Sequence, residues 1–311
     1  MRQGRGWFRP GTEARALGDC LAIRDNTLTI VTGASSNHVG CLRNLLRSID
    51  HHETAPVVVY DLGLAPEEAA LLRADGRQVV RFPFEYYPPY FGTHAKSGRP
   101  CSWKPVLIRE VIEAVDGPVL WLDAGDLVHE RLTRVRSVLA ATGFYSPDGA
   151  DVIQRYTHPQ VLALLEAQPE ILADRNRNGA IVGFGRNEIG MELSRIWRDC
   201  ALREEIMHPA GWTKRIWRSD QAILSVLVAQ FRRRHGFALE DALLGVSYHN
   251  DSLNADQAQR YMKSPPVRGG ALAVRAQDDR RIANRVRHIA NRLRRGAKRA
   301  WRRFKKALAQ H

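Results

Sequence analysis

Short apolar runs alternate with segments of helical periodicity along the first half of the chain. Strands are predicted where aliphatic and β-branched residues run together, and helices where apolar residues recur every three or four positions. The predicted strands are residues 27–32, 56–61, 78–82 and 118–122, and the predicted helices are residues 39–49, 66–74 and 105–115. This alternation predicts an α/β protein with a doubly wound, mostly parallel sheet.

The second half of the chain has a more mixed pattern. A strand is predicted over residues 181–184, helices over 188–202 and 220–231, and a short strand over 243–246. Residues 83–102 are rich in proline, glycine and aromatic residues, which predicts a long ordered loop that shapes a substrate pocket; the alternative is that its aromatic residues only pack the loop down.

Two aspartates directly follow the apolar strand at residues 118–122. The carboxyl ends of strands in open α/β sheets are where ligands bind, so Asp123 and Asp126 are expected at a cleft. Two carboxylates at such an edge are costly unless they are solvated, paired or bound to a cation, and their hard oxygens suit Mg²⁺ or Mn²⁺. The alternative is that both aspartates only cap a helix that begins near Arg131.

Charge is distributed unevenly along the 311 residues, whose formal net charge is +14. Residues 280–311 hold 13 Lys and Arg and no acidic residue, so the rest of the chain is nearly neutral. The four cysteines form no CxxC pair, which argues against a zinc site or a disulfide framework and for a reducing compartment. Without a signal-like segment or an apolar run of about 20 residues, a cytoplasmic location is expected.

The first predicted strand leads into small residues that suit a phosphate or nucleotide. Thr32 and Gly33 lie at this turn, and Asp61 ends the second strand. A dehydrogenase fingerprint is excluded because Asn37 and Val39 occupy positions that need glycine, and no tyrosine is followed four residues later by lysine.

Further polar residues stand at the predicted element boundaries. Trp103 and Lys104 precede a helix, where lysine can reach a diphosphate; the alternative is a core tryptophan and a solvated lysine. Asn178 precedes a strand and either approaches ligand hydroxyls or forms a turn. Helix capping alone would explain the polar residues at the start of the 220–231 helix. A lone histidine such as His249 is more often structural than a ligand.

Taken in their order along the chain, these motifs within residues 27–250 resemble those of GT-A nucleotide-sugar glycosyltransferases, most closely the glycogenin-like family 8 group. In that family, paired acids and a late histidine bind Mn²⁺, which implies metal ligation by Asp123 and His249. The family's second acid position is Gly125 here, so the resemblance implies either that Asp126 replaces it or that the metal site is degenerate. Asp220 and Gln221 match the family's Asp-Gln pair near the transferred sugar.

The resemblance implies an enzyme that moves a sugar from a nucleotide-diphosphate sugar, with UDP as the expected nucleotide, to a glycan or lipid-linked acceptor with Mn²⁺ or Mg²⁺. The implied residues are catalytic Asp220, Gln221 and Asn178; donor-binding Thr32, Gly33, Asp61, Trp103, Lys104 and Asp123; and metal-binding Asp123, Asp126 and His249. The alternative is a non-catalytic, degenerate GT-A protein that binds a glycan or a partner.

A cationic amphipathic helix is predicted over residues 280–311. Apolar residues recur there at steps of three and four, and arginine and lysine fill the opposite face. Such a helix is typical of binding to an anionic membrane surface, here the inner membrane face, while nucleic acid or docking on the body are competing interpretations. The expected organisation is an extension at 1–26, a GT-A-like domain at 27–264, a linker at 265–279 and this helix.

Overall fold

The protein is described by a computed structural model over residues 27–92, 101–211 and 219–262, all of which belong to one compact unit. The predicted N-terminal extension, the linker at 265–279 and the basic helix at 280–311 lie outside the described residues. No helix in the described ranges is both long enough and apolar enough to cross a bilayer.

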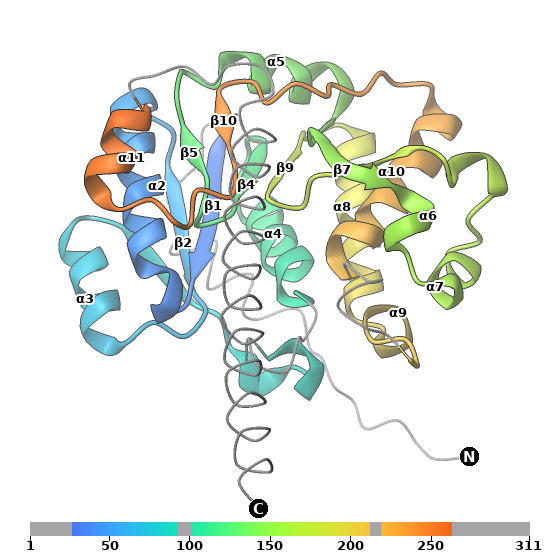
Figure 1. Ribbon diagram of the computed structural model, residues 1–311, viewed down its shortest axis with the longest axis horizontal. Helices are drawn as coiled ribbons and strands as arrows, with labels where there is room; N and C mark the ends of the chain where they lie inside the picture. The colour runs from blue at the N-terminus through green and yellow to red at the C-terminus, as the bar shows by residue number, and fades with distance from the viewer. Residues whose placement is uncertain (1–26, 93–100, 212–218, 263–311) are drawn as a thin grey trace, which may run out of the picture. The chain divides into compact units, whose positions relative to one another are not determined.

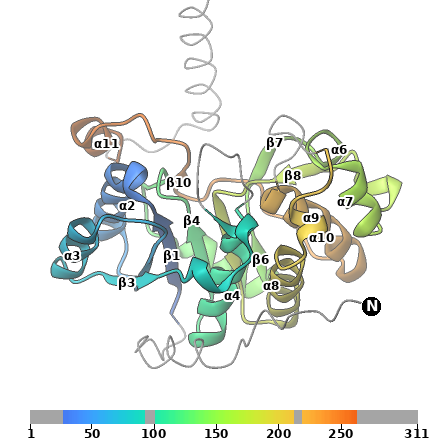
Figure 2. The same ribbon diagram turned by 90° about the horizontal axis from the view of Figure 1, so that it is seen from below.

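A six-stranded sheet with the order β3-β2-β1-β4-β9-β6 forms the centre of the unit (Figures 1 and 2). The first four strands in this order are parallel, β9 is antiparallel to β4, and β6 is antiparallel to β9. The predicted α/β class with a mostly parallel sheet is therefore confirmed. The strands are β1 (Thr29–Ala34), β2 (Val57–Asp61), β3 (Gln78–Arg81), β4 (Val119–Leu122), β6 (Phe144–Tyr145) and β9 (Ile181–Phe184).

Two small antiparallel pairs accompany the central sheet. They are β5 (Leu127–Val128) with β10 (Val246–Ser247), and β7 (Asp148–Val152) with β8 (Arg175–Arg177). The β5–β10 pair joins the segment that follows the acidic turn to a segment more than a hundred residues later. It thereby brings residues just after β10 to the end of β4.

Helices connect and cover the strands. The α-helices are α2 (Val39–His52), α3 (Pro66–Ala74), α4 (Trp103–Ala114), α5 (Thr133–Thr142), α6 (Ile153–Tyr156), α7 (Pro159–Leu164), α8 (Glu188–Ala201), α9 (Glu204–Met207), α10 (Ser219–His235) and α11 (Ala255–Met262). The 3₁₀ helices are η1 (Ser36–His38), η2 (Phe84–Tyr86), η3 (Pro89–Phe91) and η5 (Pro169–Ile171).

Alternate side chains of the central strands point to opposite faces of the sheet, which divides the core into two layers. In β4, Val119 and Trp121 pack with residues of α4, α8 and α10, whereas Leu120 and Leu122 pack with residues of α2 and α5. Because successive side chains of a strand point to opposite faces, the next residue, Asp123, is expected on the same face as Trp121.

Some element boundaries differ from the predictions. Helix α4 begins at Trp103 rather than 105, and α10 runs from Ser219 to His235, so Lys104 and Asp220 lie in first helical turns. The strand predicted at 243–246 is the shorter β10, and the loop predicted from 83 contains η2 and η3 in its described part. Helix α5 begins at Thr133, well after Asp123 and Asp126, so these aspartates do not cap it.

Candidate functional site

Several of the predicted site residues lie near the place where the strand order of the sheet reverses. From β1 the chain proceeds to β2 and β3 on one side, and it later returns to place β4 on the other side. The carboxyl ends of β1 and β4 thus border a topological switch point, the usual position of a ligand crevice in open α/β sheets.

Asp123 follows β4 at this edge, and its side chain meets two donors. Lys104 Nζ donates to Asp123 Oδ1 at 2.7 Å, and Trp121 Nε1 donates to the same oxygen at 2.6 Å. Its backbone N–H donates to the carbonyl of Ala180 on the neighbouring segment. The Asp123 side chain remains 36% exposed, so a carboxylate fixed in direction still faces solvent.

Lys104 joins three segments of the site. Its ammonium also donates to the carbonyl of Gly179 at 3.0 Å and lies 3.8 Å from Asp220 Oδ2, while its side chain is only 6% exposed. Burial alone would lower the pKa of Lys104, but the charges of Asp123 and then Asp220 outweigh it and raise that pKa above its usual range. The ammonium is therefore charged at neutral pH.

Asp220 enters the site from the first turn of α10, and its side chain is 11% exposed. Burial raises the pKa of Asp220, opposed by the nearby charge of Lys104. Its Oδ1 accepts a hydrogen bond from Ser219 Oγ at 3.2 Å. The carboxylate is thus held next to Lys104 rather than in free solvent.

Gln221 and Asn178 are brought to the same place by β9 and α10. Gln221 Nε2 donates to the Arg177 carbonyl at 2.7 Å, and a Cβ at Gly179 would lie 3.1 Å from Gln221 Cβ. Asn178 Oδ1 accepts from the Ala180 N–H at 2.7 Å and is buried in the turn that precedes β9. The turn predicted for Asn178 is present, and it lies beside the Asp-Gln pair.

Asp126 is the most deeply buried acid of this group, with 0% exposure. Its Oδ2 accepts the N–H of Asp123 at 3.0 Å, whereas its Oδ1 has no hydrogen-bond partner in the described part of the chain. Burial, and then the charge of Asp123, raise the pKa of Asp126 well above its usual value. Asp126 therefore braces the turn after β4 through its hydrogen bond with Asp123.

His249 lies in the segment that follows β10, beside the acidic turn. The backbone N–H of Asn250 donates to the carbonyl of Gly125 at 2.7 Å, which fixes this segment against the turn. His249 adopts a left-handed backbone with φ +60°, and its ring packs edge-on against Tyr248. The strained backbone and the neighbouring hydrogen bond hold His249 within the segment next to Gly125.

Thr32 and Gly33 lie inside β1. Thr32 is fully buried, and its hydroxyl has no partner among the described residues. A Cβ at Gly33 would lie 3.1 Å from Leu62 Cδ1 and from the Tyr60 carbonyl, so glycine allows β1 to pack tightly there. Both residues therefore contribute to the strand that supports the site.

Asp61 and Trp103 also have clear local roles. Asp61 Oδ1 accepts from the N–H groups of Gly63 and Leu64 at 2.8 and 2.7 Å and closes the turn after β2. The half-buried Trp103 ring lies 5.8 Å from the Trp121 ring, as expected for a tryptophan that packs at the core boundary.

The donor set at this edge fits a divalent cation that a diphosphate completes. Among the described residues, no three His, Cys, Asp or Glu side chains already converge on one point. Magnesium-type ions, however, need only one or two protein carboxylates when substrate phosphates and water supply the other ligands. Asp123 and the buried Asp126 oxygen without a partner are the observations that favour such an ion here.

Sequence reasoning missed three members of the site. The Trp121 N–H and the Gly179 carbonyl direct Asp123 and Lys104, and Asp251 lies against Gly125. The period-two pattern of β4 was the available signal for Trp121, because it places residues 121 and 123 on one face. Nothing local in the sequence indicates the other two contacts.

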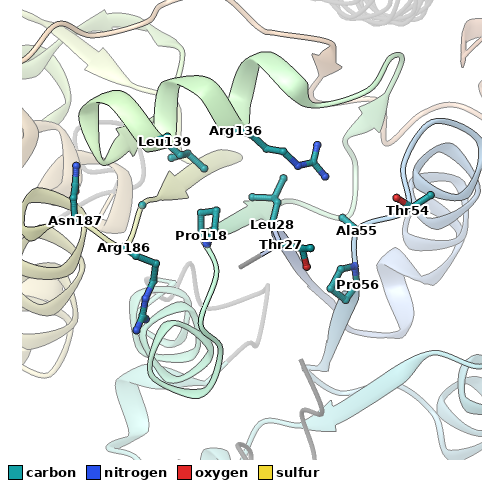
Figure 3. A pocket seen from close by; sticks show the side chains of 12 residues that line it. Thr27, Leu28, Thr54, Ala55, Pro56, Pro118, Arg136, Leu139, Arg186 and Asn187 are labelled. Carbon is teal, nitrogen blue, oxygen red and sulfur yellow. The ribbon is translucent and has the colours of Figure 1, made fainter. Parts of the chain in front are cut away.

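A large hollow of about 740 Å³ lies at the opposite, amino edge of the sheet (Figure 3). It is lined by residues that precede β1, β2 and β4, and by Arg136, Arg186 and Asn187. Arg136 pairs with Glu53, Arg186 donates to the Ile112 carbonyl, and Asn187 caps α8. Since these polar groups serve the fold, the hollow is not the catalytic candidate.

Comparison with known proteins finds similar folds but no close relative. No protein-family model matches the chain, and no curated protein matches its sequence. Similar solved structures include the galactosyltransferase LgtC in complex with donor and acceptor sugar analogs, at 15% identity, covering 77% of this chain and 96% of LgtC with a TM-score of 0.47. Another is mouse xyloside xylosyltransferase 1, at 9% identity, covering 70% and 85% with a TM-score of 0.40.

Proposed function

We propose that this protein is a glycosyltransferase that moves a sugar from a nucleotide-diphosphate sugar to a glycan or lipid-linked acceptor. The observation that carries the proposal is the Lys104 ammonium held between Asp123 and Asp220 at the switch point of the sheet. Breaking a sugar–diphosphate bond builds negative charge on the leaving phosphate and positive charge on the sugar. A site with both a fixed cation and carboxylates matches that charge pattern.

The chain's own residues take distinct parts in this reaction. Lys104 keeps its proton at neutral pH, fixes the directions of Asp123 and Asp220, and provides positive potential for the diphosphate. Asp220 and Gln221, with Asn178 beside them, position the sugar. Asp123 and His249 would hold Mn²⁺ or Mg²⁺, which when bound supplies charge neutralisation of the leaving diphosphate.

The test is calorimetric titration with UDP and a panel of UDP-hexoses, with and without Mn²⁺. We expect binding that depends on Mn²⁺ in the wild type and is lost in Asp123→Asn. Asp75→Asn is the matched control, because Asp75 is an exposed acid that follows α3, away from the carboxyl edge. Release of UDP in the presence of a glycan acceptor then reports transfer.

A non-catalytic binding protein is the second candidate, favoured by one observation. Gly125 stands where the resembling family carries its second acid. If the folded wild type binds none of these nucleotides, and no nucleotide sugar with another base, with or without metal, this second function replaces the first.

We further propose that residues 280–311 hold the enzyme at the cytoplasmic face of an anionic membrane. The support is the sequence pattern alone, 13 basic side chains opposite an apolar stripe. A protein truncated after Gly270 is expected to lose flotation with vesicles that contain phosphatidylglycerol. Equal flotation of both proteins would rule out this role of the segment.

A further inference from the structure

We propose that Asp251 supplies the second carboxylate of the cation site, in the space that Gly125 leaves open. This inference rests on the proposed function, because the cation is the one that would accompany the donor diphosphate. Asp251 lies 126 positions after Gly125 in the sequence. Its carboxylate would take the place of the side chain that Gly125 lacks.

The space around Gly125 is taken up by the side chain of Asp251. A Cβ at residue 125 would lie 2.8 Å from Asp251 Cγ and 2.9 Å from Asp251 Oδ2, and it would contact Oδ1 more closely still. Gly125 has no left-handed φ, so the backbone itself does not demand glycine. The carboxylate of Asp251 occupies the volume that a side chain at residue 125 would take, so a side chain there would displace it.

The backbone around Asp251 is anchored by hydrogen bonds to other segments. The N–H of Asn250 donates to the Gly125 carbonyl at 2.7 Å, and the thiol of Cys41 lies 3.5 Å from the Asp251 carbonyl. Two residues later, Asn44 Nδ2 donates to the Leu253 carbonyl at 3.2 Å. Because the segment is tied to both the acidic turn and α2, the carboxylate is directed at the turn by the fold.

The Asp251 carboxylate stabilises no element of the described fold. It is exposed, and no donor in the described ranges forms a hydrogen bond with it. It does not cap α11, since Asn254 Oδ1 accepts the Gln257 N–H at the start of that helix. This carboxylate lies against a turn that carries two other acids, and it has no hydrogen-bond donor. A bound cation stabilises such an arrangement.

An independent observation in the same turn also points to a ligand. The Oδ1 atom of Asp126 is completely buried and lacks a hydrogen-bond partner among the described residues. Asp126 directly follows Gly125, against which the Asp251 carboxylate lies. Lys104 is paired with Asp123 and Asp220, so Asp251 is left for another cation.

The experiment uses variants of residues 251 and 125 in the full-length protein. Binding of Mn²⁺ is measured from the electron paramagnetic resonance signal of the free ion, both alone and with UDP, so that no catalysis is needed. Asp251→Asn is expected to weaken Mn²⁺ affinity by at least about tenfold. Asp256→Asn, an exposed acid in the first turn of α11, is the matched control and is expected to leave the affinity unchanged.

The decisive variant is the double substitution Gly125→Asp with Asp251→Gly. It moves the carboxylate back to residue 125 and removes the side chain that would collide with it, so Mn²⁺ affinity is expected to return to within about threefold of the wild type. Gly125→Asp alone places two acids in one volume and is expected to lower the melting temperature. Circular dichroism of each variant verifies that it is folded.

The outcomes separate this inference from the proposed function. Mn²⁺ affinity that is unchanged in Asp251→Asn, or not restored in a folded double variant, would overturn the role of Asp251. UDP binding by the wild type without any Mn²⁺ dependence would also overturn it while leaving donor binding intact. Mn²⁺ binding that needs Asp251 while UDP does not bind would support the cation site and overturn the donor proposal.

Discussion

At the amino edge of the central sheet, a large hollow is surrounded by polar groups that already bind one another. Glu53 accepts hydrogen bonds from Arg136 and from the Leu132 N–H, and its side chain is almost fully buried. At the carboxyl edge, Lys104 is outnumbered by the acids Asp123 and Asp220, and Asp123 remains open to solvent.

We infer from this difference that unsatisfied charge, rather than the volume of a hollow, marks the edge proposed to bind the donor. Pairs that close on themselves stabilise the fold and leave nothing to offer a ligand. An excess of carboxylates around a single buried ammonium costs free energy, and a bound ligand or ion can recover it. The two edges therefore respond differently to substitution.

The largest effect is expected for Lys104→Met. The change leaves the carboxylates of Asp123 and Asp220 without their cation, so the free energy of unfolding is expected to fall by about 3 kcal/mol. Binding of UDP-sugars is expected to be lost as well. Urea unfolding and calorimetric titration measure the two consequences.

Lys104→Arg is the control for this variant, because it retains the charge and several donors. We expect it to recover part of the lost stability. If Lys104→Met binds the donor as tightly as the wild type does, the carboxyl edge is not the donor site, and the proposed difference between the two edges is wrong.

A smaller effect, confined to stability, is expected for Glu53→Gln at the amino edge. Burial opposes ionisation, but the hydrogen bonds from Arg136 and Leu132 outweigh it and lower the pKa of Glu53. Loss of these charged hydrogen bonds is expected to cost about 1.5–3 kcal/mol at pH 7. Titration with UDP-sugars should show unchanged affinity, because Glu53 does not belong to the donor site.

The pH dependence of Glu53→Gln gives a second measurement. An acid with a lowered folded-state pKa stabilises the protein above its unfolded-state pKa of about 4.3, and this contribution disappears as pH falls through the folded-state pKa. The difference in unfolding free energy between wild type and variant should therefore shrink below about pH 4. A difference that stays constant with pH would contradict the ion pair.

The smallest effect below about pH 4 is expected for Asp126→Asn, because the carboxyl group is then protonated in both the folded and the unfolded state. The folded state holds Asp126 protonated because burial raises its pKa, whereas the unfolded chain releases that proton above about pH 3.9. Wild-type stability should therefore decline as pH rises from about 4 towards the raised pKa, and the asparagine variant should lack this decline. Urea unfolding at several pH values tests the prediction, and identical slopes for both proteins would contradict it.

Much of the sheet follows from local sequence pattern. Strands β1, β2 and β4 are short apolar runs, and α3 and α8 match their predicted ranges closely, because propensity and periodicity agree in these segments. The first turns of α4 and α10 were placed one or two residues late. Their polar residues are satisfied by partners on other elements, which a local reading does not contain.

The candidate site was only partly predictable for the same reason. Asp123, Lys104 and Asp220 stand at element ends, where the general rule for α/β sheets places ligand contacts. Gly125 and Asp251 are 126 residues apart in the sequence, and the pairing of β5 with β10 brings their segments into contact. Pairing between distant strands is decided by the packing of the whole sheet, so a single sequence gives no local signal for it.

The reversed direction of β9 has a consequence for how this scaffold can diversify. Because β9 runs against β4, the loop that enters β9 reaches the same edge as the loop that leaves β4. Asn178 and Gly179 can therefore be exchanged together with their loop while β1 and β4 keep their register. Gly179 and Ala180 hold Lys104 and Asp123 through their backbone carbonyls, so side-chain substitutions at residues 178–180 can keep these two contacts. On the proposed function, this short turn is therefore the starting point for engineering a new donor preference.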